Sequence, residues 1–239
     1  MTLPALIPGQ SALLLDFDGT LVEIAPRPDA ITVPPHLPAL LDRLHDRLEG
    51  AVALVSGRSV EDLRRYLPEF PGTIIGSHGA ERAAPGEAPK VAVGTDGLEE
   101  LRAAVADYAR TRHDLLVESK THSVVLHFRQ APELGPEVAR FMGELADRYA
   151  DFALQEAKMA WELRPGSADK GVAVRDLMGT GPFRGRLPVY VGDDTTDEAA
   201  MRVAAKFGGC GIKIGEGSSV AAHRLRDPAA FQEWLGRAV

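Results

Sequence analysis

The chain has 239 residues, of which 45% are hydrophobic and 26% are charged, with a formal net charge of −7 and one cysteine. This length suits a single large domain or a core with one insertion, and the apolar content is ample for a packed interior. The acidic balance and the lack of a Lys/Arg cluster argue against nucleic acid as a partner, and no apolar stretch approaches the ~20 residues that span a bilayer.

Two features of the sequence bear on the compartment. The N-terminal stretch MTLPALIPGQ lacks a basic region followed by a long apolar segment, so we expect a cytoplasmic protein that is not bound to a membrane. Cys210 lies in an apolar, glycine-flanked stretch, which indicates a buried structural thiol. Nothing in the sequence indicates the oligomeric state.

The first expected element is a buried strand that ends in acidic residues. The apolar run Leu13 to Leu15 is followed by Asp16 and Asp18, and Gly19 and Thr20 then turn the chain. Because side chains alternate along extended backbone, both carboxylates can point the same way. The carboxyl ends of strands are where open parallel sheets bind ligands, although aspartate is also common in simple turns.

Two further strands end in polar loops. The repeated leucines of residues 37–48 predict a helix, and the buried strand 51–55 then ends in Ser56-Gly57-Arg58. Ser59 is expected to begin another helix. The short strand 73–75 enters GSHGAE at 76–81, a glycine-bracketed turn.

From residue 83 to residue 165 the pattern changes. A helix is expected at 96–111, strands at 115–119 and 122–128, a second helix at 134–149, and strands at 152–157 and 159–163. The order is αββαββ, which indicates an inserted domain with one open sheet. Residues 1–82 and 166–239 are then expected to form the core.

The core pattern resumes with a helix opened by Ala168-Asp169-Lys170. The buried strand 187–191 runs into GDDTTDE at 192–198, and a last strand and the helix 228–237 close the chain. The predicted fold class is α/β, with a doubly wound, Rossmann-like core of parallel strands and an inserted αββαββ domain.

Polar residues from separate strand ends should meet at one edge of this sheet. Grouped carboxylates favour a hard cation, and Mg²⁺ fits better than zinc because no His/Cys cluster offers zinc ligands. Taken singly, these residues could instead be helix caps or surface groups. The set is Asp16, Asp18, Ser56, Lys170, Asp193 and Asp197.

The sequence resembles the haloacid dehalogenase superfamily of aspartate-nucleophile phosphohydrolases. The resemblance rests on DFDGT at 16–20, Ser56, Lys170 and GDDTTD at 192–197. Within the superfamily the chain is similar to the trehalose-6-phosphate phosphatases. The stretches that carry this closer resemblance are SGR at 56–58, GSHGAE at 76–81, GDDTTDE at 192–198, VESKTHSVVLHFR at 117–129 and ELRPGSADKG at 162–171.

The resemblance implies roles for the core residues. Asp16 would attack phosphorus and form an aspartyl-phosphate, and Asp18 would act as acid and then as base. Ser56 and Lys170 would hold the transferring oxygens. Mg²⁺ would be bound by the Asp16 side chain, the Asp18 backbone carbonyl and Asp193, with its waters ordered by two more carboxylates, Asp194 and Asp197.

The resemblance also implies that the inserted domain is a cap that closes over the site and reads a sugar. Its charged residues Glu118, Lys120, Arg129, Lys158 and Glu162 are expected on strands. Three of them, Glu118, Lys120 and Glu162, resemble glucose-binding positions, and the alternative is a sheet surface with cross-strand ion pairs.

Three core residues keep two possible roles. His78 and Glu81 would contact the ligand or brace the hinge, and Arg58 would lie near phosphate or be structural. The leading functional hypothesis is a Mg²⁺-dependent phosphatase that releases trehalose from trehalose 6-phosphate, with this small sugar phosphate as partner. The alternatives are a phosphatase for another sugar phosphate, such as a mannosyl or sucrose phosphate, and a sugar-phosphate-binding regulatory module without turnover.

Overall fold

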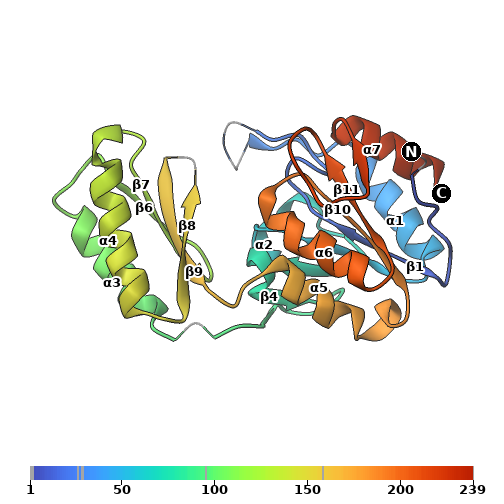
Figure 1. Ribbon diagram of the computed structural model, residues 1–239, viewed down its shortest axis with the longest axis horizontal. Coiled ribbons are helices and arrows are strands. Elements are labelled where there is room, and N and C mark those ends of the chain that lie inside the picture. The colour runs from blue at the N-terminus through green and yellow to red at the C-terminus, as the bar shows by residue number, and fades with distance from the viewer. Residues whose placement is uncertain (1–2, 26, 28–29, 95, 158, 239) are drawn as a thin grey trace. The chain divides into compact units, whose positions relative to one another are not determined.

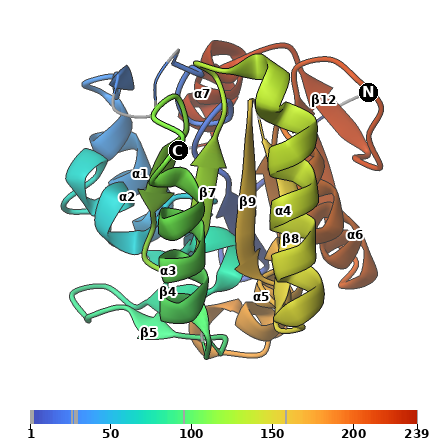
Figure 2. The same ribbon diagram turned by 90° about the vertical axis from the view of Figure 1, so that its left-hand side faces the viewer.

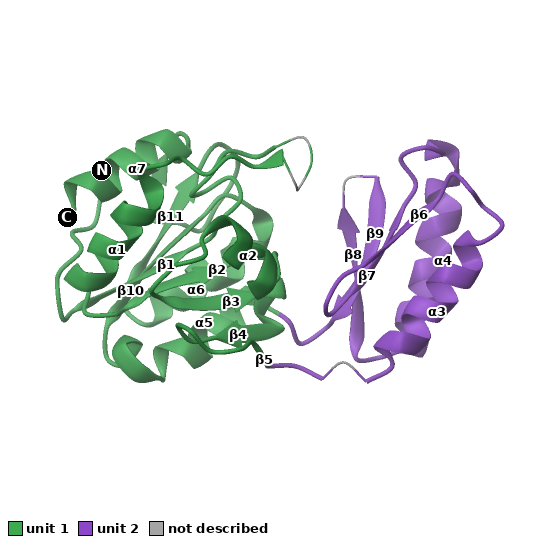
Figure 3. Ribbon diagram, turned by 180° about the vertical axis from the view of Figure 1, so that it is seen from behind, with its two compact units in different colours: residues 1–90, 169–239 green, residues 91–168 purple. Residues whose placement is uncertain are grey.

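The computed structural model describes residues 3–25, 27, 30–94, 96–157 and 159–238. The chain divides into two compact units, coloured separately in Figure 3. Unit 1 consists of Met1–Lys90 and Asp169–Val239, and unit 2 consists of Val91–Ala168. The segment just after residue 82 stays with unit 1, because Ala83 pairs with Ile74 in the sheet of that unit.

Unit 1 is built on an eight-stranded sheet with the order β12-β11-β10-β1-β2-β3-β4-β5. Its strands β1, β4, β10 and β11 are labelled in Figure 1. The pairs from β12 to β3 are parallel, and β4 runs antiparallel to β3. The strands are β1 (Ser11–Leu15), β2 (Val52–Val55), β3 (Thr73–Gly76), β4 (Glu81–Ala83), β5 (Lys90–Val91), β10 (Leu187–Gly192), β11 (Cys210–Ile214) and β12 (His223–Leu225).

Helices cover both faces of this sheet. Leu13 and Leu15 of β1 pack in one cluster with residues of α1, α2 and α7, whereas Leu14 packs in another cluster with residues of α5 and α6. The predicted doubly wound α/β class is therefore confirmed. The helices are α1 (Leu37–Arg47), α2 (Val60–Tyr66), α5 (Lys170–Met178), α6 (Glu198–Lys206) and α7 (Pro228–Arg237).

The sequence explains where these elements begin. Every residue of β1 is buried, as expected for a strand covered on both faces. Ser59 and Asp169 cap α2 and α5, because their side chains accept hydrogen bonds from Asp62 N at 3.1 Å and Val172 N at 2.9 Å. Ser59 lies in the loop that leaves β2, so its cap fixes the start of α2 beside the end of that strand, whereas Asp169 is the residue at which the chain returns from unit 2 to unit 1.

Unit 2 is a four-stranded antiparallel sheet with the order β6-β7-β9-β8. Two helices cover one face (Figure 2), where Leu101 and Met142 pack with Val124 and Leu126 of β7. Along the chain the order is helix, two strands, helix, two strands. The elements are α3 (Leu98–Ala109), β6 (Leu116–Ser119), β7 (Val124–His127), α4 (Gly135–Arg148), β8 (Phe152–Ala157) and β9 (Ala160–Pro165).

Some sequence expectations need correction. Lys120 follows the end of β6 and Arg129 lies in a turn after β7, so neither is a strand residue. The strands β4, β5 and β12 were not predicted, because two or three residues are too few to show a period. Cys210 begins β11 and is only half-buried, and this partial burial raises the pKa of its thiol. Among the described residues no helix is long and apolar enough to cross a membrane.

Candidate active site

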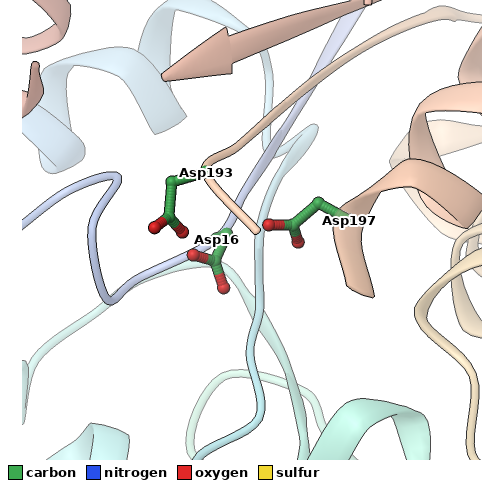
Figure 4. A group of neighbouring side chains, drawn as sticks. All are labelled: Asp16, Asp193 and Asp197. Atoms are coloured by element: carbon green, nitrogen blue, oxygen red, sulfur yellow. The ribbon is translucent and has the colours of Figure 1, made fainter. Parts of the chain in front are cut away.

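Three carboxylates meet at the carboxyl ends of β1 and β10 (Figure 4). Asp16 directly follows β1, and Asp193 directly follows β10. Asp197 comes from the turn that leads into α6. One oxygen of each carboxylate lies within 4.8 Å of the others, so the sequence expectation that these three residues meet agrees with their positions. Because β1 and β10 are adjacent parallel strands, their pairing places the first two side chains together.

A buried lysine binds two of these carboxylates. Lys170, the first residue of α5, places Nζ 2.8 Å from Asp16 Oδ1 and 2.7 Å from Asp197 Oδ1. Tyr190 of β10 donates from Oη to the same Asp197 oxygen at 2.7 Å. Tyr190 was not predicted, and its only sequence signal is a hydroxyl inside the otherwise apolar strand that precedes GDD.

Two glycines make room for this cluster. A Cβ on Gly19 would lie 2.1 Å from Asp193 Oδ2, and Gly19 also has a φ of +75°. A Cβ on Gly192 would lie 2.3 Å from Asp197 Cγ. Both glycines are therefore required by the close approach of the carboxylates, and Gly19 is also required by its backbone conformation.

The electrostatics of the cluster follow from burial. Burial raises the pKa of Asp16 well above its usual value, and Asp197 and Asp193 add to this, while Lys170 opposes it. Burial, together with Asp197 and Asp194, raises the pKa of Asp193 to about 6. Burial would lower the pKa of Lys170, but Asp16 and Asp197 outweigh it and raise that pKa. Three carboxylates against one ammonium leave an excess of negative charge.

Asp18 is held apart from this cluster by Arg58. The guanidinium binds both carboxylate oxygens, with Nε at 2.6 Å from Oδ2 and Nη2 at 2.9 Å from Oδ1. Arg58 also reaches Asp62 at 3.2 Å and lies 5.1 Å from the centre of the Tyr66 ring. This two-pronged contact is the strongest geometry available to a carboxylate and a guanidinium. Arg58 is thus a partner of Asp18.

The remaining core positions lie on the loops that follow β2 and β3. Ser56 is buried, and its Oγ accepts a hydrogen bond from Arg58 N at 3.2 Å. Glu81 is also buried, and its Oε1 accepts from Val60 N and from Ser77 Oγ, both at 2.9 Å. These contacts support the bracing role for Glu81.

Asp194 points into its own turn. Its side chain accepts from Thr195 N at 2.7 Å and caps the turn 195–197 together with Asp197. Asp197 in turn accepts from Asp194 N at 3.0 Å through Oδ2. Asp194 is therefore not in the group of three carboxylates, and its observed contacts are those of a cap.

The polar residues of unit 2 form pairs across the face of the sheet that is opposite its helices. Glu118 Oε2 lies 2.8 Å from His127 Nε2. Lys120 Nζ lies 3.2 Å from Glu162 Oε1, and that oxygen also accepts from Ser123 Oγ at 2.5 Å. The register places Glu118 and Glu162 on opposite sides of Val125. The cross-strand pairs expected as one alternative are thus present.

Four positions of unit 2 complete this description. His127 and Ser123 were not singled out in the sequence, and the alternation of β7 only marks His127 as being on the face opposite the apolar residues Val124 and Leu126. Arg129 is exposed in a turn. Lys158 lies outside the described residues. The structure thus gathers one polar set in unit 1 and another in unit 2.

Sequence comparisons agree with this geometry. The family model described as trehalose-phosphatase matches residues 14–229. A protein of Sinorhizobium fredii named probable trehalose-phosphate phosphatase is 41% identical over 205 residues, which cover 85% of this chain and 77% of that protein. The trehalose-6-phosphate phosphatase of Escherichia coli is 34% identical over 229 residues, which cover 94% of this chain and 85% of that protein.

Solved structures agree as well. A crystal structure of a trehalose-6-phosphate phosphatase related protein has a TM-score of 0.79 and 27% identity, and the match covers 95% of this chain and 96% of that one. A haloacid dehalogenase-like hydrolase from Bacteroides thetaiotaomicron has a TM-score of 0.70 and 16% identity over 96% of this chain and all of its own, so it shares the fold. The resemblance predicted from the motifs is confirmed: the chain belongs to the trehalose-phosphatase family of phosphoric monoester hydrolases.

Proposed function

We propose that this protein is a Mg²⁺-dependent phosphatase that hydrolyses trehalose 6-phosphate to trehalose and phosphate through an aspartyl-phosphate on Asp16. The observation that carries the proposal is the buried cluster in which Lys170 lies 2.8 Å from Asp16 and 2.7 Å from Asp197, with Asp193 beside them. The names of the relatives from Sinorhizobium fredii and Escherichia coli support the substrate.

The residues present fit a divalent cation. Three carboxylates face one another with one ammonium between them, and the pKa of Asp193 is raised to about 6 by burial and its acidic neighbours. Oxygen ligands without a His/Cys cluster suit Mg²⁺. Asp16, Asp193 and the Asp18 carbonyl would hold the ion, and Asp194 and Asp197 are the carboxylates proposed around it. When bound, Mg²⁺ supplies positive charge against the repulsion between carboxylate and phosphate.

The proposed reaction has two steps on the chain's own residues. An Asp16 oxygen attacks phosphorus, the bond from phosphorus to the sugar oxygen breaks, and Asp18 protonates the departing oxygen. In the second step the Asp18 carboxylate takes a proton from water, the water oxygen bonds to phosphorus, and the Asp16 carboxylate leaves. Lys170 and Ser56 are the proposed donors to the phosphoryl oxygens.

Arg58 holds the Asp18 side chain in one position. The contacts at 2.6 and 2.9 Å hold the carboxylate while it is ionised, as the second step requires of a base. To protonate the sugar oxygen, Asp18 must carry a proton and give up part of this pairing. Arg58 is therefore proposed to act near the phosphate indirectly, by holding the Asp18 carboxylate in place.

Unit 2 is proposed to be the cap that reads the sugar. Glu118, Lys120 and Glu162 carry groups that pair with hydroxyls, and they lie on or beside the polar face of its sheet. Arg129 and Lys158 belong to the same proposed set. Of the two roles open for His78 and Glu81 in unit 1, contact with the ligand and bracing, we propose bracing. In the substrate complex the present partners, His127 and Ser123, would orient the two glutamates.

The test is phosphate release from a panel that contains trehalose 6-phosphate, sucrose 6-phosphate, a mannosyl phosphate and p-nitrophenyl phosphate, with and without chelator. We expect the highest kcat/KM on trehalose 6-phosphate and loss of activity in chelator that added Mg²⁺ restores. Preference for another sugar phosphate would reject the substrate, chelator-resistant turnover would reject the metal, and binding without release would favour a regulatory module. The cytoplasm remains the proposed compartment, and small sugar phosphates the proposed partners.

A further inference from the structure

The turn between β3 and β4 adopts an unusual backbone conformation. Ser77, His78 and Gly79 have φ values of 49°, 57° and 108°, so three consecutive residues lie in the left-handed region. Serine and histidine seldom adopt this conformation, and it persists only where surrounding contacts determine it. The conformation of this turn is therefore maintained by contacts with the residues around it.

Gly79 lies against the start of α5, where an added Cβ would be 3.0 Å from Ala173 Cβ, whereas the hydrogen bonds of the turn lead to the loop that follows β2. Ser77 N donates to Arg58 O at 2.7 Å, and His78 N donates to Ser56 O at 2.9 Å. The buried carboxylate of Glu81 joins Ser77 Oγ and Val60 N, each at 2.9 Å. The turn thus holds the backbone of residues 56–60 at three points.

The His78 ring adds a fourth contact. A Cβ built on Gly57 would lie 2.6 Å from both Cε1 and Nε2 of His78, so the imidazole occupies the space of a side chain at position 57. Gly57 is the residue between Ser56 and Arg58, and its own φ is not in the left-handed region. The glycine is therefore required by the ring that packs on it.

We propose that the turn Ser77–Glu81 is a positioning element for the phosphoryl-binding loop, and that the seat of the His78 ring on Gly57 sets the positions of Ser56 and Arg58. This inference rests on the proposed function, because it takes Ser56 as a donor to phosphoryl oxygens and Arg58 as the partner of Asp18. His78 and Glu81 are then positioning residues. A displacement of about 1 Å at such a site can cost about 100-fold in rate.

The experiment is a double-mutant cycle with Gly57→Ala and His78→Gly. Alanine at 57 pushes the ring away, whereas glycine at 78 removes the ring and adopts the left-handed backbone without strain. We expect Gly57→Ala in the wild-type background to lower kcat/KM by about 10- to 100-fold and to raise the inhibition constant of inorganic phosphate in parallel. In the His78→Gly background the same change should cost no more than about twofold, the usual error of additivity.

Gly236→Ala is the matched control. It makes the same substitution in unit 1, at a helical glycine where an added Cβ meets no atom within 4 Å, and we expect wild-type kinetics. A Gly57→Ala loss that is the same in both backgrounds overturns the proposal, as does a loss with an unchanged inhibition constant for phosphate. Circular dichroism and thermal unfolding establish that each variant is folded.

A second pair of variants decides the question if Gly57→Ala does not fold. Glu81→Ala removes the acceptor that joins Ser77 and Val60, and Glu81→Gln keeps an oxygen there. We expect a loss of about tenfold for the alanine variant and rescue of most of it by glutamine. Wild-type kinetics in both variants would overturn the proposal.

The cycle is measured with p-nitrophenyl phosphate and inorganic phosphate, which contain no sugar. If the wild-type enzyme hydrolyses p-nitrophenyl phosphate but not trehalose 6-phosphate, the proposed substrate is refuted. The positioning role of the turn is then still decided by whether the effects of Gly57→Ala and His78→Gly on p-nitrophenyl phosphate hydrolysis are coupled. Conversely, trehalose 6-phosphate turnover with additive variants supports the function and refutes the positioning role of the turn.

Discussion

Asp16 in unit 1 and Glu118 in unit 2 are held in opposite ways. In unit 1, Asp16 and Asp197 are buried and share Lys170, whose side chain is only 3% exposed. In unit 2, Glu118 is nearly half exposed and contacts His127, and Lys120 is nearly half exposed and contacts Glu162, whose side chain is 10% exposed. A buried carboxylate must keep its partners, whereas an exposed one can exchange a side chain for a sugar hydroxyl at little cost. The first arrangement suits a catalytic centre, whose groups must stay in place. The second suits ligand recognition, in which side chains exchange partners.

The largest expected effect is the loss of turnover in Asp16→Asn. An amide cannot attack phosphorus, so phosphate release should fall by about 10⁴-fold or more. The fold should persist, because the change removes one negative charge from a crowded cluster. Phosphate release and thermal unfolding measure the two effects. Appreciable turnover by the folded variant would reject Asp16 as the nucleophile.

Removal of each lysine compares the two units directly. Lys170→Met leaves buried carboxylates without their ammonium and should lower the free energy of unfolding by about 3–5 kcal/mol. Lys120→Met removes an ion pair in which the lysine is 41% exposed and Glu162 is 10% exposed but keeps its hydrogen bond from Ser123, so the loss should be smaller, about 1 kcal/mol. Urea unfolding without Mg²⁺ measures both, and similar losses would contradict the comparison.

Substitutions on the sheet of unit 2 should lower kcat/KM for the sugar phosphate and leave hydrolysis of a substrate without a sugar almost unchanged. Each of Glu118→Ala, Lys120→Ala and Glu162→Ala should cost about 1.5–3 kcal/mol in kcat/KM for trehalose 6-phosphate, because each removes a charged hydrogen bond to a hydroxyl. Hydrolysis of p-nitrophenyl phosphate should barely change. The measured quantity is the ratio of the two kcat/KM values, and an unmoved ratio would mean that these residues form only surface ion pairs.

The smallest effect concerns pH and the pair Glu118–His127. The hydrogen bond from His127 lowers the pKa of Glu118 below its usual value, with burial opposing. A lowered carboxylate pKa stabilises the fold above the unfolded value and loses this contribution as pH falls through the folded value. The free energy of unfolding of His127→Ala should therefore differ from wild type by a few tenths of a kcal/mol at about pH 6, since the pair is exposed to solvent.

The same difference should shrink toward about pH 3, as pH falls through the lowered pKa of Glu118 and the carboxylate takes up a proton in both proteins. Urea unfolding at the two pH values provides the measurement, and Glu118→Gln is the control that should show no such pH-dependent difference. A gap between wild type and His127→Ala that grows toward low pH would contradict the assignment.

The sequence predicted those parts of the site that depend on strand ends. Asp16, Asp193 and Lys170 each lie directly beside a strand or helix boundary that composition marks clearly, and parallel strands must bring their ends together. Tyr190 could not be predicted in this way. In the sequence it cannot be distinguished from the other large side chains of a buried strand, and its hydrogen bond to Asp197 is a tertiary contact.

Partners that depend on side-chain direction were also missed. The alternation of β7 marks the face of His127, but the residue opposite it depends on the register with β6. The bonds of Asp194 within its own turn were not predicted either, since an aspartate after a strand can serve as a cap or as a ligand with equal ease. Likewise, the space that Gly57 leaves for His78 involves loops after two different strands.

The pairing of β1 with β10 has a consequence for the order in which the protein can fold during synthesis. Ser11 lies opposite Leu187, so this pair of neighbouring strands joins two segments that are far apart in the sequence. A nascent chain that has not yet reached β10 cannot give β1 its neighbour on that side, and the Asp16 cluster cannot assemble before β10 and the residues that follow it have been synthesised. The elements between them include unit 2, whose sheet and helices pack on one another. Folding of that segment on its own would shorten the effective loop that must close and reduce its entropic cost. The inserted segment would then help to bring the catalytic strands together, besides its proposed role in recognition.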